Sequence, residues 1–301
     1  MIIYFYKISS GENMEYKNLS TYFRNKYGKR LKKICIDGGF SCPNRDGTCG
    51  VGGCVFCGDE GAGEHIKKDV DIRGQVIRAL EGALSDDGFV AYFQSFTNTY
   101  APVSVLKERY DAALCDKRIR VLAIGTRPDC INEDIARLIA SYKDRVDVWV
   151  ELGLQTSNDS TASVINRGYK SEVFTQAVKI LNKYGIDVVA HIIIGLPGES
   201  LSDIKNTVDF LNRHELFGLK IHSLYIMKNT QLEQMYQRGK YTPLSKEEYI
   251  DMAVYVLKSI NPQTVIHRLT GDCPQDLLVA PEWNSDKHEI IDSIRKKLAR
   301  G

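Results

Sequence analysis

The sequence has 301 residues and a formal net charge of +2, because 40 Lys and Arg stand against 38 Asp and Glu. This near balance argues against a protein that coats nucleic acid through bulk charge and leaves room only for a local basic patch. Hydrophobic residues make up 43% and charged residues 26%, which is typical of a globular protein with a sizeable buried core. No apolar run reaches the length of about 18 residues that a membrane span needs, so we expect no contact with a membrane.

Short apolar runs alternate with amphipathic segments along most of the chain. Six of the runs are predicted β-strands, at residues 33–37, 89–95, 121–126, 146–154, 186–197 and 219–226. Between them, the spacing of apolar residues predicts helices at 69–85, 103–115, 131–141, 171–184 and 200–213. This alternation indicates a parallel sheet with helices outside it, and its near-continuous apolar runs suit strands that are covered on both faces.

The number of these units favours one kind of parallel α/β fold. Six are too few for a closed eight-stranded barrel, and no glycine-rich dinucleotide fingerprint follows the first strand. We therefore predict a partial (β/α)6 TIM-type barrel that is open on one side, with a helical C-terminal extension. Helical stretches at 245–260 and 286–299 and a short strand candidate at 264–269 belong to that extension. The predicted division is an N-terminal extension at 1–30, a core barrel at 31–228 and a capping C-terminal extension at 229–301.

The cysteine usage and the start of the chain indicate where the protein works. Five of the eight Cys fall between positions 35 and 57, which in a long chain indicates a metal site in a reducing compartment rather than a disulfide scaffold. The apolar residues 1–6 lack the basic region and the cleavage site of a signal peptide. We therefore expect a cytoplasmic protein, with Met1 and Met14 as alternative starts.

The loop after the first predicted strand contains four Cys and is rich in glycine. Cys54 and Cys57 form a CxxC pair, and a third ligand must come from Cys42 or Cys49. Soft thiolates select iron-sulfur clusters or zinc, and a zinc site with all four Cys fits the spacing as well. The loop follows a strand at the rim where α/β barrels carry their chemistry, which favours a catalytic cluster with one open iron.

A basic segment precedes this loop. Residues 22–33 interleave aromatic side chains with six Lys and Arg. Such a segment can bind RNA phosphates and stack bases, and the competing interpretation is an amphipathic helix with a solvated basic face.

Six stretches spread in order along the chain resemble the radical S-adenosylmethionine (SAM) superfamily. Within it they are similar to the branch of the Elongator-type catalytic subunit and the oxygen-independent coproporphyrinogen oxidases, and to the YhcC/YtqA-type group. They are DGGFSCPNRDGTCGVGGCVFC (37–57), YFQSFTNTYAP (92–102), GTRPD (125–129), ELGLQTSNDSTASVINRGY (151–169), HIIIGLPGE (191–199) and HRLTGDCP (267–274).

The resemblance implies a cofactor set. A [4Fe–4S] cluster is held by Cys42, Cys54 and Cys57 in a long-loop form of the usual CxxxCxxC motif, and Cys49 is not a ligand. SAM takes the fourth iron, and one electron, from a donor such as flavodoxin or ferredoxin, cleaves it to a 5′-deoxyadenosyl radical that abstracts a hydrogen from the substrate. The cofactors supply this chemistry, and the protein positions them and excludes water.

The resemblance also implies contacts with SAM, although the sequence singles out no catalytic residue. Gln155 and Arg167 match positions that hold the SAM carboxylate in the coproporphyrinogen oxidases. Thr126 and His191 stand where those relatives have Glu and Asp, which puts the same contacts in doubt. Gln94 is a candidate for the SAM amino group. Glu151 is either an acid/base or ribose contact in the barrel mouth or a rim carboxylate paired with an Arg.

The expected function is therefore that of a radical SAM enzyme. Kinship to tRNA-modifying relatives suggests tRNA as partner and a step on a wobble uridine, which is an argument by analogy. Radical chemistry on a small metabolite or cofactor precursor is one alternative. A non-enzymatic zinc- or cluster-binding module that binds RNA is the other.

Overall fold

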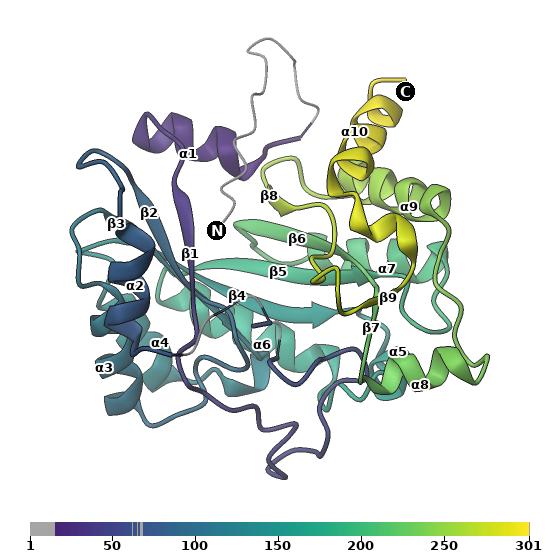
Figure 1. The fold of residues 1–301 in the computed structure, drawn as a ribbon, viewed down its shortest axis with the longest axis horizontal. Coiled ribbons are helices and arrows are strands. Elements are labelled where there is room, and N and C mark those ends of the chain that lie inside the picture. The colour runs from purple at the N-terminus through teal and green to yellow at the C-terminus, as the bar shows by residue number, and fades with distance from the viewer. Residues whose placement is uncertain (1–15, 62, 65, 67–68, 301) are drawn as a thin grey trace.

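The apolar runs form one curled, parallel sheet of seven strands in the computed structural model, which describes residues 16–61, 63, 64, 66 and 69–300 (Figure 1). The strand order is β1-β2-β3-β4-β5-β6-β8. The bounds are β1 (Lys32–Ile36), β2 (Phe89–Phe93), β3 (Ile119–Thr126), β4 (Asp147–Gln155), β5 (Asp187–Ile194), β6 (Gly218–Ser223) and β8 (Val265–Arg268). The predicted α/β half-barrel is confirmed, and its seventh strand is the short candidate at 264–269.

Helices cover the outer face of this sheet (Figure 1). They are α2 (Ile72–Leu80), α3 (Val103–Ala113), α4 (Glu133–Ala140), α6 (Ser171–Lys183), α7 (Leu201–Asn212), α9 (Lys246–Ser259) and α10 (Lys287–Leu298). Their buried faces and the outward residues of the strands, such as Phe93, Ile124 and Leu152, share one large core. None of the helices in the described ranges is long and apolar enough to cross a membrane.

The C-terminal extension that we predicted at 229–301 does more than cap the barrel. It supplies β8, which pairs with β6 through Leu219↔Ile266. It also supplies β9 (Leu278–Ala280), which pairs antiparallel with β7 (Ile226–Met227) beside α8 (Gln231–Gln237). The sheet continues across residue 228, and the division of the chain there stays a prediction.

Alternation along the strands turns every second side chain to the inside of the half-barrel. Near the strand starts this inner face is apolar, with Val90, Val121 and Val189 around Trp149. One layer further along, it is polar. The register places His191 of β5 opposite Lys220 of β6, and Lys220 opposite Arg268 of β8.

Helix α1 (Leu19–Tyr27) closes the end of the half-barrel at which β1 begins (Figure 1). Asn18 caps its first turn, and Gly28, at φ 70°, ends it in the left-handed conformation that glycine adopts without strain. Phe23 is buried and stacks on Trp149 at 6.2 Å between ring centroids. Tyr22 packs edge-on against Phe217.

The first half of the basic segment at 22–33 lies in helix α1, which sets the direction of its side chains. Phe23 is buried, and Tyr22 and Tyr27 are half-buried against the apolar starts of the strands. The interpretation of this segment as an RNA-binding patch stays a prediction. Three of its lysines form ion pairs with Asp147, Asp86 and Asp87. The segment is an amphipathic helix and a following strand with a largely solvated basic face.

We expect Phe23→Leu to lower the free energy of unfolding by about 1 kcal/mol, because the smaller side chain leaves the stack on Trp149 incomplete. Denaturant titration of the purified protein measures this loss. Tyr236→Leu is the matched control, because Tyr236 is 37% exposed and should leave the midpoint unchanged. An unchanged midpoint for Phe23→Leu would contradict the role of α1 as a packed plug.

Candidate active site

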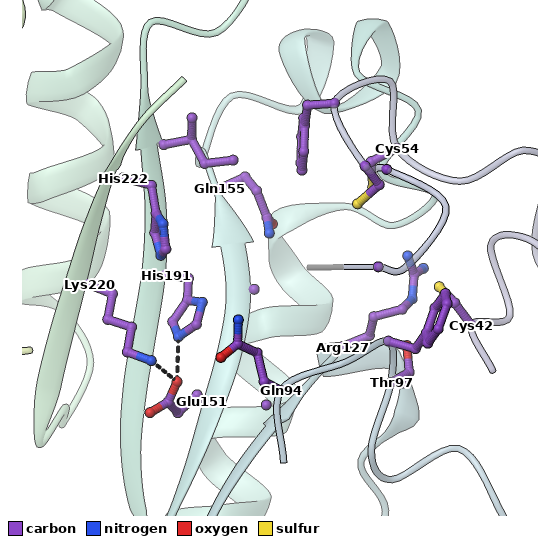
Figure 2. A pocket seen from close by; sticks show the side chains of 18 of the residues that line it. Cys42, Cys54, Gln94, Thr97, Arg127, Glu151, Gln155, His191, Lys220 and His222 are labelled. Atoms are coloured by element: carbon purple, nitrogen blue, oxygen red, sulfur yellow. Dashed lines mark hydrogen bonds and ion pairs between the residues drawn. The ribbon is translucent and has the colours of Figure 1, made fainter. Parts of the chain in front are cut away.

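A cavity opens where the strands end, and three cysteines line it. Cys42, Cys54 and Cys57 face this space from the loop after β1. Cys49 belongs to the same loop but is exposed and lies outside the cavity lining. Figure 2 shows Cys42 and Cys54 on one side of the cavity and a group of charged side chains on the other. The structure thus brings together the three cysteines that the resemblance implies as ligands.

Backbone and amide hydrogen bonds hold the cysteine loop in place. The Asn166 amide donates to the carbonyl of Gly53 at 2.7 Å, and the Asn44 amide donates back to the carbonyl of Asn166 at 2.6 Å. Gly53 lies at φ 77°, where a side chain would be strained and would also meet Arg45 at 2.9 Å. The sequence NRG at 166–168 therefore positions the loop.

The Cys54 and Cys57 thiols form a hydrogen bond to each other. It lowers the pKa of Cys54, helped by Arg127, and raises the pKa of Cys57. Within the described ranges, no three His, Cys, Asp or Glu side chains are placed to hold a single metal ion. Each cysteine that holds a [4Fe–4S] cluster binds a different iron, so such a cluster does not need three ligands around a single ion.

Five of the six residues expected to contact SAM line the cavity. They are Gln94, Thr126, Glu151, Gln155 and His191. Thr126 is hydrogen-bonded to Thr99 at 2.6 Å between hydroxyl oxygens. Between these side chains the wall is bare backbone at Gly125 and Gly153, where a Cβ would meet Phe93 O at 3.0 Å and the Gln155 amide at 2.7 Å. Neither glycine therefore leaves room for a side chain.

Arg167 is the exception, because it lies behind the wall. Its guanidinium is 1% exposed and donates to the carbonyls of Leu154, Thr156 and Tyr169 at 2.5 to 2.9 Å. It also pairs with Asp159 at 3.3 Å. In this structure Arg167 supports the turn after β4, and the prediction that it binds the SAM carboxylate stays a prediction.

Two residues of the lining have strained backbones. Gln155 lies at φ 61° and Phe96 at φ 56°, in the left-handed region that costs a side chain about 1–2 kcal/mol. The carbonyls of Gly153 and Leu154 face the Gln155 amide, which assigns the amide nitrogen to that side as donor. Strain of this kind persists where the surrounding structure fixes it, and it gathers at functional sites.

Glu151 lies opposite the cysteines and is neither exposed nor paired with an Arg. Its carboxylate accepts hydrogen bonds from Trp149 at 3.1 Å, from His191 at 2.9 Å and from Lys220 (Figure 2). Lys220 also donates to the Tyr92 hydroxyl at 3.2 Å. Because an ionised carboxylate only accepts, Nε2 of His191 carries the proton. The interpretation of Glu151 as a rim carboxylate is therefore wrong.

Burial and charge set the protonation of this cluster. Burial alone would raise the pKa of Glu151, but Lys220 and His191 outweigh it and hold that pKa well below its usual range. Burial lowers the pKa of Lys220 to about 7, against the raising effect of Glu151. Burial, together with Lys220, lowers the pKa of His191 to about 4. Near pH 7 the cluster therefore contains an anionic Glu151, a neutral His191 and a Lys220 near its midpoint.

Comparisons with known proteins identify the family. Residues 46–211 match the model of the radical SAM superfamily, and residues 217–300 match the radical SAM C-terminal domain. The chain is 36% identical to YtqA of Bacillus subtilis over 293 residues, which cover 96% of this chain and 91% of YtqA. It is 34% identical to YhcC of Escherichia coli over 259 residues, 86% of this chain and 84% of YhcC. This chain belongs to the radical SAM superfamily.

More distant proteins share part of this radical SAM chain. The structure of Elp3 from Methanocaldococcus infernus superposes on this structure with a TM-score of 0.64 at 17% sequence identity. The superposition covers 89% of this chain and 63% of the Elp3 chain, and it shows that the two share a fold. The tRNA uridine(34) acetyltransferase of Methanocaldococcus jannaschii is 29% identical over 187 residues. That match covers 60% of this chain and 34% of the acetyltransferase.

Membership decides two alternatives that the cysteine spacing left open. Radical SAM proteins are enzymes that use a [4Fe–4S] cluster and SAM. Membership therefore decides for the cluster over a structural zinc site, and for an enzyme over a non-enzymatic binding module. The residues present fit these groups, because three thiols, two glycines and five polar side chains expected to contact SAM line one cavity.

The sequence interpretation missed Lys220, Tyr92 and His222 as residues of the radical SAM cavity. Lys220 and His222 are two positions apart in the apolar run LKIHSLYI, which is the spacing that puts both on one face of a strand. Two polar residues at that spacing in a buried strand were the signal from which the sequence could have predicted these cavity residues. Arg127 is also in the lining, although it bonds to Asp129 and to the carbonyl of Arg167.

Proposed function

We propose that this radical SAM enzyme modifies tRNA, on the side chain of a wobble uridine. The observation that supports the proposal is the match to the tRNA uridine(34) acetyltransferase over 187 residues, 60% of this chain. The match leaves two thirds of the acetyltransferase uncovered, so the proposal concerns the radical step on the uridine and not acetyl transfer.

The site can be assigned residue by residue within this proposal. Cys42, Cys54 and Cys57 hold the cluster, and Gln155, Gln94 and Thr126 contact SAM along the glycine-bare wall. When bound, cluster and SAM together supply a one-electron cleavage that starts radical chemistry. Helix α1 closes the end of the half-barrel at which the strands begin, so the substrate base enters from the opposite end, where the cysteines lie.

We expect tRNA from a strain that lacks the gene to show one altered uridine derivative, which mass spectrometry of nucleosides detects. A copy of the gene on a plasmid should restore the wild-type profile, and a copy with Cys54→Ala should not. Cys115→Ala is the matched control, because Cys115 lies outside the cavity lining. An unchanged nucleoside profile in the deletion strain would remove tRNA and leave a small metabolite as the substrate class.

A further inference from the structure

The cluster around Glu151 is a feature that neither the cysteine site nor the packing of the barrel requires. Lys220 and Glu151 are 2% and 0% exposed in their side chains. Taking both charges out of water costs several kcal/mol for each ion, and apolar residues of similar volume often stabilise a core as well. The neighbouring inner layer does use apolar residues, with Val90, Val121 and Val189. The ionic layer therefore calls for a functional reason.

The hydrogen bonds within the cluster fix where a mobile proton can reside. Glu151 accepts three side-chain donors, which stabilise it as an anion. The bonds of Lys220 to Glu151 and to the Tyr92 hydroxyl use two of the three N–H groups of an ammonium. The Lys220 amine also lies 4.3 Å from the centroid of the Tyr92 ring. Two neighbours therefore hold the amine in one place.

The position of Lys220 relates the cluster to the substrate. Lys220, Tyr92 and Glu151 line the same cavity as the three cysteines. Figure 2 shows Lys220 and Glu151 on the wall opposite Cys42 and Cys54. A substrate that lies between the two walls meets the radical-generating side at one end and the amine at the other. Abstraction of a hydrogen atom needs no side chain that accepts a proton, so this wall is available for a separate proton transfer.

We propose that Lys220 is the acid–base residue of this enzyme, with Glu151 and Tyr92 as its positioning residues, and that the substrate exchanges a proton as well as a hydrogen atom. As a free amine, Lys220 takes the proton of a substrate N–H or O–H group. The bond to hydrogen breaks, its electron pair stays on the substrate atom, and a new N–H bond makes the ammonium. The reverse step returns a proton. This inference deepens the proposed function.

The electrostatic surroundings suit this role. General acid–base catalysis is most efficient when the pKa of the group lies near the working pH, and the pKa of Lys220 is about 7. Burial is the main cause, and Lys33 and Arg268 add to it, whereas Glu151 opposes it. The titratable and charged groups that face Lys220 come from β1, β2, β4, β5, β6 and β8. They are Lys33, Cys35, Tyr92, Glu151, His191, His222, His267 and Arg268.

A titration of the lysines tests the proposal without a substrate. Holoenzyme with its cluster oxidised is labelled with ¹³Cε-lysine, and the lysine resonances are followed by NMR from pH 5 to 11. The signal that is missing from Lys220→Arg identifies Lys220. We expect its midpoint near pH 7. A midpoint near 10 for Lys220 would overturn the proposal.

Lys220→Arg also separates proton transfer from a merely structural ion pair. Arginine keeps the charge and the bonds to Glu151 but does not lose its proton. With tRNA from the deletion strain, we expect product formation to fall about 100-fold or more and SAM cleavage by a chemical reductant to continue. Wild-type product formation should change through a midpoint near pH 7. Lys33→Met, which removes the other lysine beside the Tyr92 ring, should still form product and move that midpoint upward, because Lys33 helps to lower the pKa of Lys220.

The two proposals fail in different ways. If Lys220→Arg forms product at the wild-type rate with the same pH profile, Lys220 is structural and the inference is wrong. If wild-type enzyme leaves every tRNA nucleoside unchanged, the proposed tRNA function is wrong, and the lysine titration then decides on Lys220 by itself.

Discussion

Replacing Cys42 with alanine should abolish reductive cleavage of SAM. Cys42 is the ligand candidate furthest from the CxxC pair in sequence, and without it the cluster would keep only two thiolates from this cavity. The wild-type protein, purified without oxygen, should carry ~4 Fe per chain, as expected for one [4Fe–4S] cluster, and the variant should lose most of it. Iron analysis and chromatography of 5′-deoxyadenosine measure the two effects.

Cys49→Ala is the matched control for this experiment. Cys49 lies seven positions after Cys42 in the same loop, but it is exposed and outside the cavity lining. We expect its alanine variant to keep its iron and most of its SAM cleavage. Equal losses in the two variants would refute the choice of Cys42 over Cys49 as the third ligand.

Glu151→Ala should destabilise the protein more than any other single change at the polar wall. It leaves the Lys220 ammonium buried without its counter-ion, and breaking a buried pair in this way costs about 3–5 kcal/mol. We expect this loss at pH 6, where Lys220 is mostly charged in the wild-type protein. Denaturant unfolding monitored by circular dichroism measures it.

The same variant has a pH dependence with a definite sign. The pKa of Lys220 is lower in the folded chain than in the unfolded chain, so the unfolded chain binds more protons between about pH 7 and 10. Stability from this group therefore rises with pH in that window. Without Glu151 the folded pKa falls further, so the deficit of Glu151→Ala should be smaller at pH 9 than at pH 6. A deficit that grows with pH would contradict this assignment of charges.

An exposed ion pair supplies the control for Glu151→Ala. Glu133 pairs with Lys183 at 2.9 Å, and both side chains are largely in solvent. Water screens such a pair, so Glu133→Ala should hardly move the denaturation midpoint at either pH. A comparable loss in the two variants would mean that burial of the Glu151 pair is not the cause.

The sequence predicts much of this fold because its signals are local. Buried parallel strands appear as apolar runs, and their regular alternation with amphipathic segments is enough to predict a half-barrel. β8 was seen only as a candidate, because four residues carry little periodicity and its partner β6 lies more than 40 residues earlier. The inward packing of Phe23 in α1 could not be predicted, because it depends on an uncovered strand end far away in sequence.

The sequence by itself determined the family and the cysteine loop, because spacing such as that between Cys42, Cys54 and Cys57 is a local property of the chain. The tertiary structure decided which polar residues share the cavity. It moved Arg167 behind the wall and brought Glu151, His191 and Lys220 together from three strands. The physical reason is that register and curl of the sheet set the contacts of inward side chains, and pairing between distant strands sets both.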